Sequence, residues 1–434
     1  MKRALILGLV ILSGCAIRPA GEDEERAKAQ AVGKPYEERN LPTLVKDASW
    51  QDVLRYAILA NGELEQRYWE WRSALEMIPQ DASPGTSPTI SYGAMFENGA
   101  TSWNRQSIGL GSDPMNNIPW PGKLAAAGER ALEMARAAGF RFERAKFDLQ
   151  ARVLSAYYDL ALQAELIRLQ EADVTLLETI DELAEARSRA GAVPQQDLLK
   201  TRTARDLARN QLQNLQAQLP GRLASLNALL NRPADSALSP KLPKPRVNAY
   251  TDEQLIALVA ERNPELRALA HEIQARKDGV RLAQMQFIPD FGLNAVTSLD
   301  GMVQNLMAMI TAPFVRFEAI RGAIEQAKAQ ASAMRAMRRH VESDLRARIL
   351  TDLYLLRNAD RQITLFRETI VPRAEEVVTR ARAAYTAGQV PLVELLDSQR
   401  MLIEVRTMLA RLQVEREKLL AEVESVAAVD IEKR

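Results

Sequence analysis

The sequence predicts a mainly helical protein with a small β part, built from two similar halves. A stretch occurs twice, 197 residues apart: GAVPQQDLL begins at Gly191, and GQVPLVELL begins at Gly388. No proline occurs from Leu124 to Ala190, which is enough for on the order of 100 Å of helix. Short stretches of alternating apolar and polar residues precede the long helical segments. These observations predict duplicated halves of the order helix, β-hairpin, long helix, helix.

Each copy of the repeated stretch has the composition of a tight turn between two helices. Gly191 and Gly388 would end one helix, because glycine adopts the left-handed conformation at little cost. Pro194 and Pro391 would begin the next helix, where a missing N–H is tolerated. The tips of two helical hairpins are therefore predicted at Gly191, Val193, Pro194, Gly388, Val390 and Pro391. The alternative is that these residues only shape a turn.

The halves can be placed by their matching helix starts. SWQD at Ser49 and TDEQ at Thr251 both have the pattern of a helix-capping box. We place the first half at 49–230 and the second at 251–430, joined by a proline-rich linker over 231–250.

A β-hairpin is predicted in each half, over about 88–113 and about 289–312. In the first, apolar residues alternate with small or polar ones from Ile90 to Glu97 and again from Arg105 to Gly111. In the second, five consecutive apolar residues over 306–310 interrupt the alternation.

The long helix of the first half carries two apolar stripes. One follows intervals of seven residues from Val153 to Val174, and the other runs from Leu154 to Leu183. A helix with two stripes packs against neighbours on two sides, as helices in a ring do. The second half repeats this helix from about 319 to 387 and is interrupted at Pro372. The helix that follows the first tip is predicted to break at Pro220.

The N-terminus has the pattern of a bacterial lipoprotein signal. Basic residues precede an apolar run that is shorter than the ~20 residues of a membrane-spanning helix. The sequence LSGC then ends at Cys15, the single cysteine of the chain. We predict a signal peptide over 1–14, acylation of Cys15 and an extended lipidated tether over 15–48. Ala16 favours sorting to the outer membrane, by resemblance to Gram-negative lipoproteins; an ordinary buried cysteine is the alternative.

Composition argues against several classes of protein. The chain has 57 basic and 56 acidic residues, so it lacks the concentrated basic character of nucleic-acid-binding domains. The sequence contains no nucleophile elbow, HExxH motif or P-loop, and we therefore predict no enzyme activity and no cofactor. The thirteen methionines, including Met307 and Met337, are interpreted as apolar packing and not as metal ligands.

The predicted strands impose a condition on assembly. Two hairpins give four strands per chain, whereas the smallest outer-membrane barrels use eight. An open sheet in lipid would leave backbone groups unpaired at a cost of several kcal/mol each. If the strands enter a membrane, several chains must share one barrel.

Nearly the whole chain after residue 49 resembles the TolC family, the outer-membrane factors of bacterial tripartite efflux systems. The resemblance is carried by the duplicated halves, NPEL at Asn263, LNALL at Leu226, and YTAG at Tyr385 followed by LLDSQ at Leu395. It implies a homotrimer in which a shared 12-stranded outer-membrane β-barrel continues into a long periplasmic α-helical barrel. The chain departs from the family pattern at the interrupted second hairpin and at Pro220.

The resemblance also implies a function. The protein would be a passive exit duct, lipid-anchored in and spanning the outer membrane of a Gram-negative bacterium and extending into the periplasm. Substrate would arrive from an inner-membrane pump of the RND type through a periplasmic adaptor. WPGKL at Trp120 resembles the copper/silver and cobalt/zinc/cadmium branch, which implies heavy-metal cations as cargo. The alternatives are drug or solvent efflux, or a periplasmic coiled-coil lipoprotein scaffold or adaptor.

Candidate site residues lie at the two tips. Glu394 and Asp397 are three residues apart, hence on one face of a helix, and in a threefold ring they would form two stacked acidic collars. By resemblance they take the positions of the family's periplasmic gate acids. Asp197 and Gln196 take the matching polar positions of the first tip, and Tyr385 takes that of the gate tyrosine. The same resemblance implies that the tips contact the adaptor; the alternative is that these acids are solvated at a helix start, where the helix dipole favours them.

Overall fold

The computed structural model describes residues 17–33, 35, 38–84, 88–112, 118–191, 193–240, 242, 244–299, 303–311 and 316–430. Cys15 and the predicted signal peptide lie outside these residues. The described chain divides into two compact units. Unit 1 takes the residues up to 33, 66–143 and 264–342, and unit 2 takes 35–65, 144–263 and 343–430.

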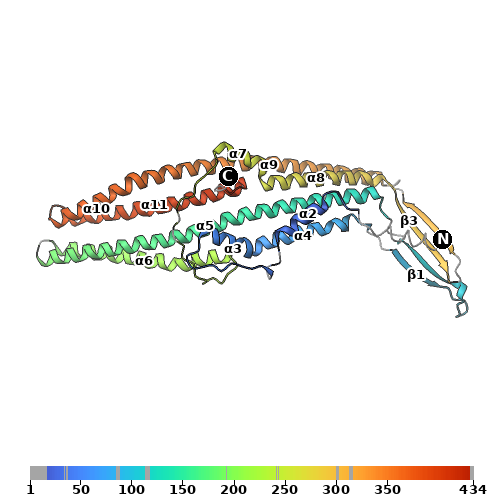
Figure 1. Ribbon diagram of the computed structural model, residues 1–434, viewed down its shortest axis with the longest axis horizontal. Helices are drawn as coiled ribbons and strands as arrows, with labels where there is room; N and C mark the ends of the chain where they lie inside the picture. The colour runs from blue at the N-terminus through green and yellow to red at the C-terminus, as the bar shows by residue number, and fades with distance from the viewer. Residues whose placement is uncertain are drawn as a thin grey trace. The chain divides into compact units, whose positions relative to one another are not determined.

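The order of elements confirms the predicted fold class of mainly helical, duplicated halves (Figure 1). The first half contains α3 (Trp50–Ala60), α4 (Gly62–Asp81), β1 (Pro88–Ala94), β2 (Gln106–Ser112), α5 (Pro121–Arg189) and α6 (Gln195–Leu229). The second contains α7 (Asp252–Arg262), α8 (Pro264–Gln284), β3 (Asp290–Ser298), β4 (Val303–Thr311), α9 (Phe317–Leu365), α10 (Val371–Thr386) and α11 (Leu392–Ala427). None of the described helices combines the length and the apolar character needed to cross a lipid bilayer.

The four strands form one antiparallel sheet in unit 1, in the order β1-β2-β3-β4 (arrows in Figure 1). Directly paired residues share a face, so the register assigns the two faces. One face is apolar and includes Ile90, Tyr92, Ile108, Phe291, Ala308 and Ile310. The other carries mostly small or polar residues, including Ser91, Gly93, Ser107, Gly109, Gly292 and Ser298. The apolar face is exposed, since Ile90 is 78% and Ile310 is 77% accessible.

The weak alternation of the second hairpin has a structural explanation. The β3–β4 register shifts between Val296 and Thr297, as it does at a bulge. In the paired part of β4, Ala308 and Ile310 lie on the apolar face, while Met307 and Met309 lie on the face with small residues. The flexible methionine side chain suits both apolar and mixed surroundings, so it hides a period of two in the sequence.

Two expectations of irregular backbone are corrected. The tether contains a helix, α2 (Glu22–Val32), whose first turn holds four acidic residues that favour the helix dipole. Arg26 of α2 donates to a carboxylate oxygen of Glu76 at 2.7 Å, which fixes α2 against α4. The break predicted at Pro220 is also absent, because α6 continues through Pro220 to Leu229. The second half does have an interruption, a π-helical turn over Phe366–Ile370 just before Pro372.

A pair of buried asparagines shows the duplication at the level of side chains. Asn61 and Asn263 each stand between two short helices, α3 and α4 in one half and α7 and α8 in the other. The Nδ2 of Asn61 donates to the Leu229 carbonyl at 2.9 Å, at the end of α6. The Nδ2 of Asn263 donates to the Val426 carbonyl at 2.8 Å, at the end of α11. Each half therefore ties the end of its last helix to the kink between its first two.

A single arginine of the linker is buried in unit 2. The Nε of Arg246 lies 3.0 Å from Glu417 and its Nη1 lies 2.9 Å from Glu424. The Arg246 guanidinium also stands over the ring of Trp50 at 5.2 Å. Burial lowers the pKa of Arg246, but the carboxylates of Glu424 and Glu417 and the hydroxyl of Tyr158 together outweigh burial, and the pKa stays above its usual value. The arginine is therefore charged at every accessible pH, and it fastens the linker to α11.

Replacing Arg246 tests this attachment. Arg246→Met would leave Glu417 and Glu424 buried without the guanidinium, and we expect it to lower the free energy of unfolding by about 3–5 kcal/mol. Arg152→Met is the control, because the Arg152–Glu63 pair at 2.8 Å is half exposed and should be worth less than about 1 kcal/mol. Urea unfolding of each variant in detergent, followed by circular dichroism at 222 nm, measures the difference. Equal midpoints for the two variants would contradict the assignment.

Candidate functional site at the hairpin tips

The two tips have the backbone that their glycines and prolines favour. Gly191 and Gly388 have φ angles of +70° and +76°, in the left-handed region that costs other residues energy. Pro194 and Pro391 follow in extended conformation, and α6 and α11 begin at the next residue. Figure 1 shows both tips as short loops, one joining α5 to α6 and the other joining α10 to α11. The backbone preferences of glycine and proline therefore account for both turns.

The helices that lead to the tips share one apolar core in unit 2. It is formed by Val174, Leu177, Ile180, Ala208, Ala381, Tyr385, Leu392 and Leu395. These residues come from all four helices, α5, α6, α10 and α11. Val390, at the second tip, packs against this core and is half-buried, whereas Pro194 and Pro391 are exposed. The tips therefore adjoin a packed apolar core, and their glycines and prolines are exposed to solvent.

Tyr385 is buried between the two hairpins, and its contacts include a residue that the sequence did not suggest. The Arg187 guanidinium lies 4.7 Å from the centre of the Tyr385 ring, and Arg187 donates to the Tyr385 carbonyl. Burial raises the pKa of Tyr385; Arg187 opposes this shift and Asp197 adds to it. The Tyr385 hydroxyl has no hydrogen-bond partner among the described residues. Arg187 thus joins the end of α5 to the end of α10.

The four polar residues predicted at the site lie in different surroundings. Glu394 and Asp397 are exposed on the first turns of α11, and Gln196 is exposed on α6. Asp197 is partly buried, with the Lys200 amine 3.7 Å from its carboxylate. Gln196 and Asp397 line one groove between α6 and α11.

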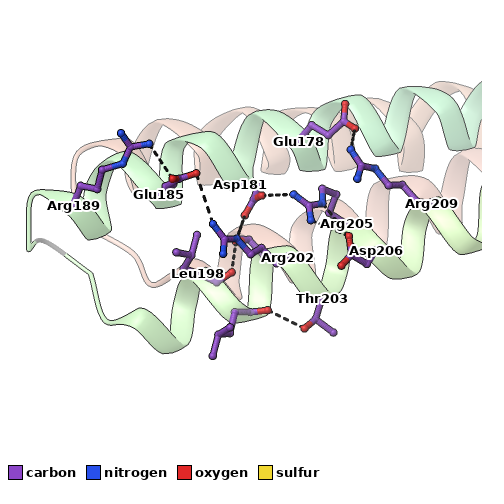
Figure 2. A network of polar contacts seen from close by, with 12 residues as sticks. Glu178, Asp181, Glu185, Arg189, Leu198, Arg202, Thr203, Arg205, Asp206 and Arg209 are labelled. Carbon is purple, nitrogen blue, oxygen red and sulfur yellow. Dashed lines mark hydrogen bonds and ion pairs between the residues drawn. The ribbon is translucent and has the colours of Figure 1, made fainter.

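An ionic network that sequence reasoning did not identify crosses the first hairpin, between α5 and α6 (Figure 2). Asp181 of α5 is 6% exposed. Its carboxylate accepts from Thr201 Oγ1 at 2.8 Å and from Arg205 Nη1 at 2.6 Å. Arg202 Nε approaches the same carboxylate at 4.0 Å. Three side chains of α6 therefore converge on one buried acid of α5.

Further ion pairs flank Asp181 on both sides. Toward the tip, Glu185 pairs with Arg202 at 3.8 Å and with Arg189 at 2.9 Å (Figure 2). Away from the tip, Glu178 pairs with Arg209 at 2.5 Å. The first hairpin is thus held in register by directional contacts at three successive levels.

The second hairpin keeps one level of this network but not the level around Asp181. Glu375 and Arg406, at the positions that match Glu178 and Arg209, pair at 2.7 Å. The 197-residue offset between the halves places Val378 where Asp181 stands and Leu402 where Arg205 stands. In the structure, Val378 and Leu402 are buried together with Ala374 in an apolar cluster. The duplicated hairpins therefore differ at the level of Asp181, where ion pairs hold the first and apolar packing holds the second.

The family model of outer membrane efflux proteins matches residues 85–232 and 255–427, which include both sheet hairpins and both tips. The chain belongs to the outer membrane efflux protein family. The resemblance inferred from the sequence is confirmed.

Known proteins of the same kind include two curated relatives and solved structures. The chain is 25% identical over 312 residues to the pyoverdine export outer membrane protein OpmQ of Pseudomonas putida, covering 68% of this chain and 65% of the relative's length. It is 23% identical over 299 residues to the cobalt-zinc-cadmium resistance protein CzcC of Cupriavidus metallidurans, covering 67% and 70%. The fold matches a crystal structure of CusC with a TM-score of 0.75 at 17% identity, covering 96% of this chain and 99% of that one.

The asymmetry between the hairpins of this outer membrane efflux protein can be tested on Asp181. Asp181→Val copies Val378 of the second hairpin and removes the acceptor of Thr201 and Arg205. Hydrogen bonds to charged groups are worth about 1.5–3 kcal/mol, so amide exchange in the first hairpin near its tip should rise by about 10- to 100-fold. Exchange in α10 and the first turns of α11 should not change. Mass-spectrometric hydrogen exchange measures both hairpins in one sample.

Asp206→Val is the matched control, because Asp206 pairs with Arg205 at 2.9 Å from an exposed position. It should leave exchange near the wild-type rate. Equal acceleration of both hairpins by Asp181→Val, or none, would show that the network does not set the stability of the first hairpin.

Proposed function

We propose that this chain is the channel subunit of a tripartite efflux system and forms, as a homotrimer, a passive exit duct through the outer membrane. Family membership supports the efflux role. The observation that carries the proposal is the four-stranded sheet, in which β1 and β4 are outer strands and one face is apolar and exposed. Three such sheets supply twelve strands, which can close a barrel and pair every edge in lipid.

Aromatic residues near both ends of the sheet support its insertion in a membrane. Phe96 and Trp103 are 68% and 62% exposed and lie between β1 and β2. At the opposite ends of the strands, Trp120 contacts Phe291 edge to face, with ring centres 6.3 Å apart. Membrane barrels carry girdles of aromatic side chains at both interfaces.

The N-terminal segment supports a lipid anchor near the sheet. The backbone N–H of Ile17 donates to the Ala82 carbonyl at 3.2 Å, six residues before β1 begins. Acylated Cys15, two residues upstream of Ile17, would place its acyl chains at the level where the strands start. Several acyl chains anchor a protein stably.

The tips are proposed as the periplasmic gate and the docking surface of the adaptor. In a trimer, the exposed carboxylates of Glu394 and Asp397 would face the pore as acidic collars, with Tyr385, Asp197 and Gln196 behind them. The docking surface would consist of Gly191, Val193, Pro194, Gly388, Val390 and Pro391. The inner-membrane pump, of the RND type, would supply the energy through the adaptor.

Heavy-metal cations are proposed as the cargo. The cobalt-zinc-cadmium resistance relative and the acidic tip residues support this choice. The pyoverdine export relative, matched at similar identity, supports an organic cargo as the second candidate. The acidic collars favour cations, because rings of Asp or Glu select cations in pores.

Conductance of the purified protein in planar lipid bilayers tests the duct and its gate together. We expect a trimer in detergent with small, cation-preferring conductance. Glu394→Ala combined with Asp397→Ala should raise the conductance and reduce the preference for cations, since the collars lose charge and bulk. Glu404→Ala combined with Glu415→Ala, on the same helix away from the tip, is the control. A monomer without conductance would refute the duct, and unchanged conductance and selectivity of the tip variant would refute the gate alone.

Metal tolerance of cells tests docking and cargo. The chain is expressed with the pump and adaptor encoded beside it, and growth on cobalt, zinc and cadmium salts is measured. Gly388→Trp should abolish tolerance while leaving trimers intact, because it blocks the tip. Gly388→Ala is the control, because it carries the same backbone strain at a φ of +76° without the bulk of tryptophan. Full tolerance with Gly388→Trp contradicts docking at this tip. Export of pyoverdine without metal tolerance would show that the cargo is organic.

A further inference from the structure

A cavity of about 710 Å³ opens between α6 and α11, with residues of α5 at its floor. Its walls are mainly apolar and include Leu177, Leu199, Leu207, Leu396 and Ile403. Small-molecule sites have volumes of about 300–1,000 Å³, apolar walls and a few polar groups that fix the ligand. The cavity lies wholly within unit 2.

The floor holds a buried carboxylate without a cation. Asp173 is 7% exposed and accepts from Gln399 Nε2 at 2.6 Å and from Gln170 Nε2 at 3.2 Å. Both donors are neutral amides, and no lysine, arginine or histidine forms an ion pair with Asp173 in the described part of the chain. Burial raises the pKa of Asp173, and the two amide hydrogen bonds only partly offset this shift. A cation that reached this carboxylate would relieve the cost of its burial.

An orphan acceptor lies beside the carboxylate. Gln399 is 5% exposed, and its Oε1 atom has no hydrogen-bond partner among the described residues. A buried polar atom without a partner costs about 1–3 kcal/mol. The floor therefore offers acceptors from two side chains, Asp173 and Gln399, and its amide donors are already engaged. This arrangement favours a ligand rich in donors.

The mouth of the cavity carries mixed charge and does not itself select a ligand. Lys200 and Arg400 are basic, while Asp397 is acidic. The Lys200 amine is held near the carboxylate of Asp197, at 3.7 Å. The opposite charges at the mouth partly cancel, so selection by charge falls to the buried floor, where electrostatic interactions are less screened.

We propose that this cavity binds a small organic cation, a guanidinium or primary ammonium group on an apolar body, with its donors between Asp173 and Gln399. A guanidinium fits best, because its planar fork of five donors can serve a carboxylate and a second acceptor together. The apolar body lies against Leu199, Leu207 and Ile403. Asp397 and Gln196, both proposed as gate residues, also line this cavity, whereas Asp173 and Gln399 belong neither to the proposed gate nor to the tips.

Calorimetric titration of the full-length protein in detergent with phenethylguanidinium and with neutral phenethylurea tests the site. Titration into empty micelles is subtracted. The two probes have nearly the same shape, so the charge–charge contact at Asp173 should make the guanidinium bind about 10- to 100-fold tighter. Asp173→Asn should remove this preference, and Asp206→Asn, an exposed acid on α6, should keep it.

Ala204→Phe provides a second variant that leaves the floor unchanged. Ala204 lines the wall, so the larger side chain fills the cavity and should abolish binding of both probes. Equal affinity of the two probes, an undiminished preference in Asp173→Asn, or undiminished binding in Ala204→Phe would overturn the proposal. Absence of binding to the wild-type protein would overturn it as well.

Discussion

The outer edges of β1 and β4 impose the constraint on which the rest of the molecule depends. Backbone N–H and C=O groups along these edges find no strand partner among the residues that the structure describes, and the exposed apolar face beside them includes Ile90 and Ile310. Water can form hydrogen bonds with the backbone groups at the edges, but contact with water is unfavourable for the apolar face. Lipid favours the apolar face but cannot form hydrogen bonds with the edges. Further copies of the same sheet would meet both requirements, which is the physical basis of the proposed trimer.

Features encoded by adjacent residues could be predicted from the sequence. The tips follow from glycine and proline at fixed spacing, and the capping box at Thr251 forms with Gln254 as its pattern indicates. Features that depend on distant residues could not. Helix α2 packs against α4 through a contact between Arg26 and Glu76, 50 residues away, and α6 passes through Pro220, which the local pattern marks as a break. The local sequence sets the intrinsic preference of a segment for helix or turn. Tertiary packing decides the conformation where these preferences have similar energies.

The same distinction applies to the tips. Glu394 and Asp397 could be nominated because their spacing places both on one helix face. Arg187 and Asp181 could not be identified from the sequence, because each interacts with residues across a turn or in the other half of the chain. Arg187 meets Tyr385, 198 residues away, and Asp173 meets Gln399, 226 residues away. One sequence signal could have revealed Asp181 once the tip was placed. Thr201 and Arg205 follow Asp181 by twenty and twenty-four residues, so they return to its level on the next helix.

The two hairpins share one plan and differ, at the level of Asp181, in the kind of interaction that holds them. Apolar contact among Ala374, Val378 and Leu402 has no preferred direction, and the Glu375–Arg406 pair beside it is partly exposed and worth little. Ion pairs and hydrogen bonds to Asp181 are directional, and a shift between α5 and α6 would leave a buried carboxylate without donors. Arg187 joins the two hairpins at Tyr385. A movement of the second tip relative to the first would therefore break this contact.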